Sequence, residues 1–574
     1  MVIFATVDAR RPGSSPKPTM EAYCEGMFSN SPRTFVADAL RGFVAATDDV
    51  TWHADPGFLT RRYRISDGQV ALLSGGGSGH EPMHAGFIGR GMLTGACPGL
   101  VFTSPNALQV HEASKAVDSG GGVVHIVKNY TGDVMNFKIA RELLQEDGIA
   151  AGVVLVDDDV ASESEDGPGR RGTAATIVVE KVCGAAAERG DSLQAVVALG
   201  RRTAENARSM AVALNPPTLP GADGPSFELP KEEIELGIGI HGERGTDRVS
   251  RLPAQEVVEK LTEPIVNSLG LNSGESVIAI VNGLGATHPL ELHLLFGELS
   301  EYLAGKGIEI TRSLVGSFVT ALNMGGASIT LVRADDEMLE LWDAPTDAPG
   351  WPNAQSQGAK PVGERGAFGP TFSPSDTGEK SAFVSEWIGS WAQRVLDEEP
   401  ALTELDRKAG DGDFGTNMVA ALEQLDLDAI KETYSAATVF EAVSEAYLGH
   451  AGGTSGALFG IWFRQFYRTM LESEPSAAAV AAAARAGLDS ITELGGARVG
   501  DKTMIDAIAP AVDALEKDGG TLQDAADAAK SGAESTKDIT ANRGRASYVG
   551  EAARGVVDPG ALVMAWFFEA AASS

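Results

Sequence analysis

QVALLSGGGSGHEP, residues 69–82, joins a short apolar run to a loop of glycine and polar residues. Three further apolar runs between residues 34 and 343 end in a similar way, in the strings VVHIVKNYTGD, ELGIGIHGERG and SVIAIVNGLGATH. Short β-branched runs that alternate with helical stretches are typical of α/β layers around mostly parallel strands. In such sheets, ligands bind at the carboxyl ends of the strands. We therefore expect an α/β domain with a binding site built from these loops.

The first loop carries four glycines beside Ser78, His80 and Glu81. Its bare backbone amides either bind a small polar ligand or form a tight strand-to-helix turn. His80 and His84 lie one helical turn apart, which is a weak metal motif. Because no third soft ligand is evident, a zinc site is not expected.

Two other loops offer side chains for chemistry. Lys128 and Asp133 bracket the second loop, where they form either a salt bridge or a cation with a general base. His241 lies in GIGIHG, which also matches the GxGxxG dinucleotide fingerprint. That fingerprint expects a second strand ending in an acidic residue about twenty positions on, whereas residues 253–261 have the pattern of a charged helix. A Rossmann site is therefore not expected.

The string LDRKAGDGDFGTNM, residues 405–418, places three aspartates within eight residues, among glycines that allow sharp turns. Oxygen ligands suit Mg²⁺ or Ca²⁺, and protein-bound Mg²⁺ usually completes its shell with water and substrate phosphates. An EF-hand is excluded because the alternate oxygen ligands and the closing glutamate are missing. The segment forms either a solvated Asp-Gly turn or a nucleotide-metal site, in which Gly415, Thr416 and Asn417 receive phosphate oxygens.

Composition changes near residue 344. Residues 344–378 are rich in Pro, Gly, Ser and Thr, which predicts a linker. Beyond it alanine dominates, and aromatic and apolar residues recur every fourth position from Phe383 to Val395, so residues 379–574 are predicted to be all α. Small-residue loops at 449–460, 495–504 and 543–560 are either helix-packing contacts or parts of a nucleotide site. The chain contains neither a Walker A sequence nor a protein-kinase signature.

The 574 residues include 79 acidic and 46 basic side chains, giving a net charge of -33. This charge repels nucleic acid and anionic membranes, so neither is an expected partner. Three scattered cysteines indicate neither a disulfide framework nor a zinc site, and no apolar run is long enough to span a membrane. Residues 1–27 are expected to be a flexible extension. With no export signal recognised, a cytoplasmic location is expected.

Eight strings occur in an order that resembles the dihydroxyacetone kinase family: GGGSGHEP, KNYTGD, GIHGE, GDGDFGTNM, GGTSG, GDKTM, GRASY and DPG. The resemblance spans about residues 28 to 572. It implies a single-chain, ATP-dependent ketose kinase, in which an α/β ketose-binding K domain of two subdomains, residues 28–343, precedes an all-α ATP-binding L domain, residues 379–574. It also implies a homodimer.

The resemblance implies roles for particular residues. His241 would hold the ketose as a hemiaminal, with His80 and Asp133 as the acid/base pair, and Gly77, Ser78, Gly79 and Lys128 would line the ketose. Asp406, Asp411 and Asp413 would bind two Mg²⁺ ions on the ATP phosphates. The positions expected around the nucleotide are Phe414, Gly415, Thr416, Asn417, Thr454, Ser455, Gly495, Met504, Arg545, Asp558, Pro559 and Gly560.

The chain departs from the family pattern at three places, namely Arg244, Phe414 and the stretch 98–100 together with Asn106. An added cation beside His241 leaves the substrate open between dihydroxyacetone and a four-carbon ketose such as erythrulose. The alternatives are a ketose kinase that takes phosphate from a phosphohistidine carrier and a non-catalytic ketose or nucleotide sensor. Relatives that cyclise FAD suggest a lyase side activity at the nucleotide site.

Overall fold

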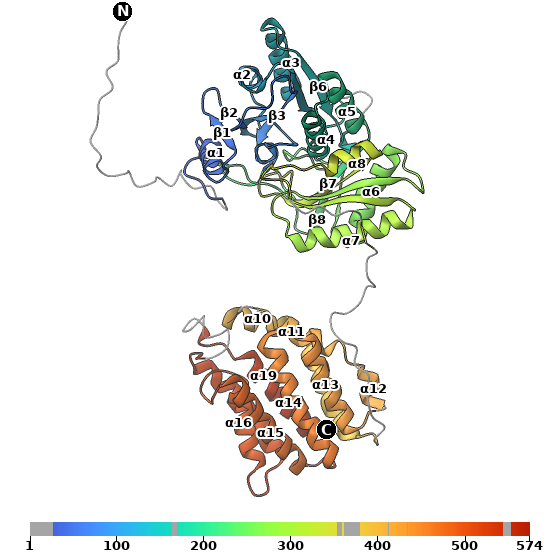
Figure 1. Cartoon of the computed structure of the whole chain (residues 1–574). Coiled ribbons are helices and arrows are strands. Elements are labelled where there is room, and N and C mark those ends of the chain that lie inside the picture. Colours follow the sequence, from blue (N-terminus) through green and yellow to red (C-terminus); the bar gives the residue numbers. More distant parts are fainter. Residues whose placement is uncertain are drawn as a thin grey trace, which may run out of the picture. The chain divides into compact units, whose positions relative to one another are not determined.

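A computed structural model describes residues 27–163, 169–352, 359–360, 379–410, 412–432, 434–542 and 553–574. These residues fall into two compact units, one up to residue 363 and one from residue 364 (Figure 1). The first unit contains two sheets and the second is helical, as the sequence predicts. None of the described helices is long and apolar enough to cross a membrane.

The first sheet has the strand order β1-β2-β4-β3-β5-β6. Its strands are β1 (Val50–His53), β2 (Phe58–Arg61), β3 (Ala71–Ser78), β4 (Gly95–Val101), β5 (Val123–Lys128) and β6 (Ala151–Val156). The four strands from β4 to β6 in this order are parallel, as predicted, while β1 and β2 form an antiparallel edge. The chain runs from β3 to its neighbour β4 on one side, and from β5 to its neighbour β6 on the other side. The strand order therefore reverses between β3 and β5, and the carboxyl ends of these two strands form a switch point where a ligand can bind.

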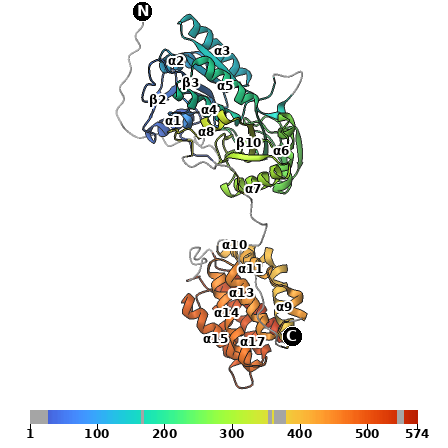
Figure 2. The same ribbon diagram turned by 45° about the vertical axis from the view of Figure 1, so that its right-hand side comes forward.

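Helices cover both faces of this sheet (Figures 1 and 2). One face packs against α2 (Ala107–Val117) and α3 (Thr131–Glu146), and the other against α4 (Ala175–Arg189) and α5 (Leu193–Glu205). Residues 175–187 of α4 are all buried, and this helix also contacts β7 of the second sheet. Helix α1 (Phe35–Ala45) packs beside β1, and two single 3-10 turns, η2 (Ala85–Phe87) and η3 (Val160–Ser162), follow β3 and β6.

The second sheet has the order β11-β10-β12-β7-β8-β9. Its strands are β7 (Ala207–Asn215), β8 (Glu233–Leu236), β9 (Asp247–Ser250), β10 (Ser276–Gly283), β11 (Glu309–Gly316) and β12 (Gly325–Arg333). Only the pair β10–β11 is parallel among these described strands, so the expectation of mostly parallel strands is wrong for this sheet. Helices α6 (Ala254–Leu269) and α7 (Pro289–Gly305) cover one face, and α8 (Asp336–Asp343) packs against α4.

The second unit is a helical bundle (Figure 2). Its helices are α9 (Ala382–Asp397), α10 (Glu399–Ala409), α11 (Phe414–Leu422), α12 (Leu427–Glu432), α13 (Ala436–His450), α14 (Gly453–Glu472), α15 (Ala477–Gly495), α16 (Ile505–Leu515), α17 (Leu522–Ser535), the 3-10 turn η4 (Thr536–Asp538) and α19 (Pro559–Ser573). Apolar and aromatic residues recur every fourth position in this helix, and this spacing places Trp387 and Trp391 on the buried face of α9. Their indole N–H groups donate to the Phe567 and Val563 carbonyls of α19, 2.7 and 3.1 Å away, so buried donors join the first and last helices.

Candidate active site

His241 lies in the loop between β8 and β9, where three aromatic rings surround it. The ring centroids of Tyr130, His80 and Phe102 lie 4.7, 4.8 and 5.3 Å from that of His241, all edge-on. These residues follow the carboxyl ends of β5, β3 and β4 respectively. Two sheets therefore bring together loops that are more than 100 residues apart in the sequence, at the edge where the sequence predicts the ligand.

Glu243 sets the tautomer of His241. Its carboxylate accepts a hydrogen bond from the His241 backbone N–H, at 2.9 Å, and its other oxygen lies 2.8 Å from His241 Nδ1. Since a carboxylate only accepts, Nδ1 carries the proton and Nε2 keeps a lone pair. Burial alone would raise the pKa of Glu243, but the hydrogen bond and charge of His241 outweigh it and lower this pKa to about 2. Nε2 is therefore the ring nitrogen that can act as a nucleophile toward a carbonyl carbon.

His80 is fully buried beside His241. Its Nδ1 lies 2.7 Å from the Thr320 carbonyl oxygen and must donate to it, which leaves Nε2 as an acceptor. Burial lowers the pKa of His80 well below its usual value, and the nearby His241 and Lys128 add to this effect. His80 is therefore neutral at physiological pH, with its lone pair directed away from Thr320.

Three buried polar atoms on residues that follow β3 and β5 have no hydrogen-bond partner among the described residues, namely His80 Nε2, Asp133 Oδ1 and Tyr130 Oη. Asp133 is 3% exposed and lies in the first turn of α3, close enough to Lys128 for their charges to interact. Buried polar groups are nearly always paired in folded proteins. Two acceptors and a hydroxyl left unpaired at the ends of two neighbouring strands are the features of a site for a small polyhydroxylated ligand.

The backbone of the glycine-rich loop packs closely against Lys128 and against the residues after β4. Lys128 ends β5, is 1% exposed, and donates to the Gly75 carbonyl at 3.1 Å. A side chain at Gly77 would lie 2.6 Å from the backbone of Phe102, so only glycine fits there. Two residues expected to line the ketose already use polar groups in hydrogen bonds within the protein. Gly79 N–H donates to Glu81 at 2.9 Å, and the Ser78 hydroxyl donates to the Gly99 carbonyl at 2.7 Å.

Two of the departures from the family pattern, Asn106 and Arg244, are not among the side chains shown to contact His241. Asn106 is the N-cap of α2, where its side chain accepts from Gln109 N–H at 2.9 Å, and Arg244 is exposed. The loop after β10 contributes no side chain to the His241 site described here. Its Leu284 carbonyl instead accepts from Ala321 N–H at 2.8 Å and supports the segment that carries Thr320.

Sequence reasoning missed Glu243, Tyr130 and Thr320. Glu243 and Tyr130 both lie within the strings GIHGE and KNYTGD, so their proximity to His241 and Asp133 was an available signal. Thr320 had none, because it contacts His80 across 240 positions of sequence.

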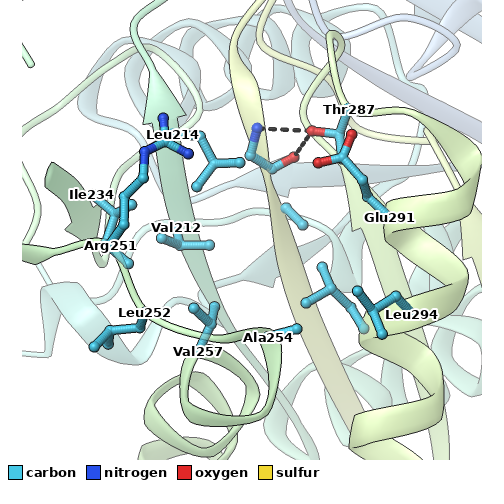
Figure 3. A pocket seen from close by; sticks show the side chains of 13 residues that line it. Val212, Leu214, Ile234, Arg251, Leu252, Ala254, Val257, Thr287, Glu291 and Leu294 are labelled. Atoms are coloured by element: carbon cyan, nitrogen blue, oxygen red, sulfur yellow. Dashed lines mark hydrogen bonds between the residues drawn. The ribbon is translucent and has the colours of Figure 1, made fainter. Parts of the chain in front are cut away.

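A cavity of about 190 Å³ lies between the second sheet and the N-terminal parts of α6 and α7 (Figure 3). Its lining is mainly aliphatic, including Val212, Leu214 and Leu294. The Thr287 hydroxyl is bonded to the Gly326 backbone, and the Glu291 carboxylate accepts from His288 N–H as part of the cap of α7. These polar groups serve the fold, which distinguishes this cavity from the site at His241.

In the helical unit, most of the predicted nucleotide positions lie at helix starts. Gly415, Thr416 and Asn417 form the first turn of α11, Thr454 and Ser455 that of α14, and Pro559 and Gly560 that of α19. Met504 and Asp558 are the N-caps of α16 and α19, and Gly495 ends α15. Unpaired amides and the helix dipole favour anions at such ends. Phe414 is buried, and its amide donates to Asp406 at 3.0 Å.

The same region concentrates acidic side chains. Burial raises the pKa of Asp558 to about 7, and the carboxylates of Asp506 and Asp406 add to the rise against the opposing effect of Lys502. The oxygen-only donors Asp406 and Asp413 suit Mg²⁺. Among the residues that the structure describes, no three acidic or histidine side chains meet closely enough to hold a metal. Two further predicted positions, Asp411 and Arg545, lie outside the described residues.

Comparison with known proteins assigns the two units. Residues 41–350 match the Dak1 domain family and residues 408–573 the DAK2 domain family. The chain belongs to the dihydroxyacetone kinase family. Within this family, the chain is 38% identical to the L-erythrulose 1-kinase of Mycolicibacterium smegmatis over 94% of its length and 98% of that protein. It is 37% identical to the triokinase/FMN cyclase of Homo sapiens over 93% and 97% of the two chains.

The dihydroxyacetone kinase of C. freundii, solved in complex with AMP-PNP and Mg²⁺, has a similar fold. That structure superposes with a TM-score of 0.61 and 32% identity, over 96% of this chain and all of that one. The family expected from the eight strings is thereby confirmed, as is the fold class. The chain is accordingly a kinase.

Proposed function

We propose that this member of the dihydroxyacetone kinase family transfers the terminal phosphoryl group of ATP to a terminal hydroxyl of a small ketose bound covalently at His241. The observation that carries the proposal is that His80 and Tyr130, whose ring contacts surround the His241 imidazole fixed by Glu243, each bear a buried, unpartnered polar atom, as does Asp133 on the helix that follows Tyr130. The kinases named above supply the reaction class, and the AMP-PNP complex of the C. freundii enzyme supports ATP as the donor.

Ketose capture follows from the His241 tautomer. The Nε2 lone pair forms a C–N bond to the carbonyl carbon as the π pair of the C=O bond moves to oxygen. Nδ1 gives up its proton to the Glu243 carboxylate, which releases it to solvent, and solvent returns one proton to that oxygen, so the net change moves one proton from Nδ1 to oxygen and leaves a neutral hemiaminal beside an ionised Glu243. Glycerol has no carbonyl and cannot react in this way.

In the next step, the ketose hydroxyls interact with His80 and Asp133. The free lone pairs of His80 Nε2 and Asp133 Oδ1 accept hydrogen bonds from hydroxyl groups, and Asp133 removes the proton of the hydroxyl that attacks phosphorus. Phosphoryl transfer depends mainly on alignment and charge neutralisation. Mg²⁺, when held by Asp406, Asp411 and Asp413, supplies that neutralisation on the ATP phosphates.

The named relatives differ in their ketose, so the substrate has to be measured. The test is a coupled assay of ADP release with dihydroxyacetone, erythrulose, a five-carbon ketose and glycerol. We expect turnover with at least one of the two smaller ketoses and none with glycerol. ADP release with glycerol but with no ketose would contradict the proposal.

Arg244 provides a test of ketose length. If its exposed guanidinium binds a further hydroxyl, Arg244→Pro weakens erythrulose use more than dihydroxyacetone use, by about 1–3 kcal/mol for a charge-assisted hydrogen bond. Comparing kcat/KM for the two ketoses measures this difference. Equal losses on both substrates would exclude Arg244 as the residue that selects a longer ketose.

A further inference from the structure

Three titratable side chains form a continuous buried chain behind the glycine-rich loop. Lys128 Nζ lies 2.7 Å from His84 Nε2, and His84 Nδ1 lies 2.6 Å from Glu180 Oε1. The three residues are 1%, 6% and 0% exposed. They come from the end of β5, the segment after β3 and the middle of α4, so the fold brings together groups separated by up to 96 positions.

The hydrogen bonds define where the protons lie. The Lys128 ammonium donates to the Gly75 carbonyl and to His84 Nε2, so the His84 proton must be on Nδ1, where it is donated to the Glu180 carboxylate. Burial lowers the pKa of Lys128 and raises that of Glu180 to about 8, which favours the uncharged form of each. The charges of Lys128 and Glu180 oppose this effect, because each favours the charged form of the other, and the imidazole of His84 joins the two groups by hydrogen bonds.

One double proton shift interconverts the charged and uncharged forms. The ammonium passes a proton to His84 Nε2 while the Nδ1 proton moves to Glu180, leaving an amine, a neutral imidazole of the other tautomer and a carboxylic acid. No atom or charge enters or leaves the chain of three groups. Lys128 is also faced by Asp133 from α3 and by His80 from the glycine-rich loop, and its amine lies against Gly76.

Taking Lys128 as a ketose ligand, which rests on the proposed function, we infer that His84 and Glu180 are positioning residues that fix its amine beneath the glycine-rich loop and hold its proton. Neither is among the groups proposed to contact the ketose. They act through Lys128, and the pair makes a fully buried lysine cation possible without solvent.

The test substitutes Glu180→Gln in the full chain, which keeps the shape and removes the charge. The Glu180 carboxylate stabilises the Lys128 cation, so without it the ammonium loses its proton at a lower pH. We expect the alkaline limb of the ketose kinase pH profile to move to lower pH. The KM for ketose should rise about tenfold, the effect of one lost charge-assisted hydrogen bond, with the KM for ATP unchanged. NMR of ε-¹³C-labelled lysine follows the ionisation of Lys128 directly.

Glu188→Gln is the matched control, because Glu188 lies on the same helix but pairs with Arg61, 2.6 Å away. It should change neither the Lys128 titration nor the pH profile. If Glu180→Gln leaves both as in the unmodified protein, the inference is overturned.

A further readout does not depend on folding of the variant or on kinase activity. The ¹⁵N spectrum of the unmodified protein should show His84 protonated on Nδ1, whereas a proton on Nε2 would overturn the inference. Absence of ketose turnover in the unmodified protein would refute the proposed function, while the Lys128 titration would still decide whether His84 and Glu180 control its charge.

Discussion

At the scale of single residues, the chemistry of the site depends on which nitrogen of His241 carries a proton. The carboxylate of Glu243 holds that proton on Nδ1, so the nucleophilic lone pair is at Nε2. A carbonyl carbon responds to this lone pair, while an alcohol carbon does not. Under the proposed mechanism, selectivity between ketose and glycerol is therefore a matter of reactivity.

His241→Ala tests that selectivity. Without the imidazole no other group at the site distinguishes C=O from CH–OH by reaction, so ketose affinity should fall strongly and discrimination against glycerol should disappear. Calorimetric titration with ketose and with glycerol measures both affinities. A variant that still binds ketose and excludes glycerol would refute covalent capture.

Glu243→Gln tests the role of the carboxylate. The substitution leaves the His241 tautomer undefined and removes a charge-assisted hydrogen bond, so ketose affinity should fall about 10-fold to 100-fold. The low native pKa of Glu243 adds stability that is present above its ordinary value of 4.5 and is lost as pH falls toward about 2. Acid titration of stability should show a smaller loss over this interval for Glu243→Gln than for the unmodified protein.

At the scale of elements, the site at His241 is formed by loops whose positions are fixed by the strands that precede them. Gly77 closes β3 against the backbone of Phe102 and Thr103, where a methyl group would lie 2.6 Å from main-chain atoms. Backbone cannot move aside as a side chain can. The position of the glycine-rich loop is thus set by the neighbouring strand end.

We predict that Gly77→Ala displaces this loop, weakens ketose binding and lowers stability by about 1–3 kcal/mol, the usual cost of overpacking. Denaturant unfolding and ketose titration measure the two effects. Gly297→Ala is the control, because Gly297 lies within α7 and a methyl group there meets open space. That change should leave ketose binding intact and raise stability by roughly 0.5–1 kcal/mol. Equal ketose affinity in both variants would contradict the steric account.

Strand direction and contacts between the two sheets could not be predicted from the sequence. The apolar run SVIAIVNG is expected among mostly parallel strands, but β10 pairs antiparallel with β12, and a continuous apolar run looks the same in a parallel and an antiparallel sheet. His80 was identified in its glycine-rich string. Its partner Thr320 was not, because that hydrogen bond exists only after two sheets have packed together.

At the scale of the whole molecule, the two units have separate cores. Four tryptophans, Trp387, Trp391, Trp462 and Trp566, belong to the core of the helical unit, and Trp342 and Trp351 to that of the first. Eight short strings spread over both units carry the family resemblance in the sequence. The nucleotide positions were assigned by resemblance alone, and they remain predictions.

The separate cores predict that nucleotide binding can be lost while ketose binding is kept. Asp413→Ala removes one anionic oxygen donor from the proposed metal site, so turnover of Mg-ATP should be lost and added Mg²⁺ should restore it poorly. Ketose binding in the other unit should stay nearly normal. Calorimetry with ketose and with AMP-PNP in Mg²⁺ measures the two halves, and the exposed Asp518→Ala serves as the control. Near-normal turnover in Asp413→Ala would show that this carboxylate is not a metal ligand.

The three rings around His241 also give the site a magnetic signature. Each ring meets the imidazole edge-on at 4.7 to 5.3 Å, so the carbon-bound protons of His241 lie in the local fields of neighbouring aromatic currents. Their resonances should be displaced from those of an exposed histidine and should move again when a C–N bond forms at Nε2. A ketose titration followed at these two protons would therefore report adduct formation in solution, without ATP and without turnover.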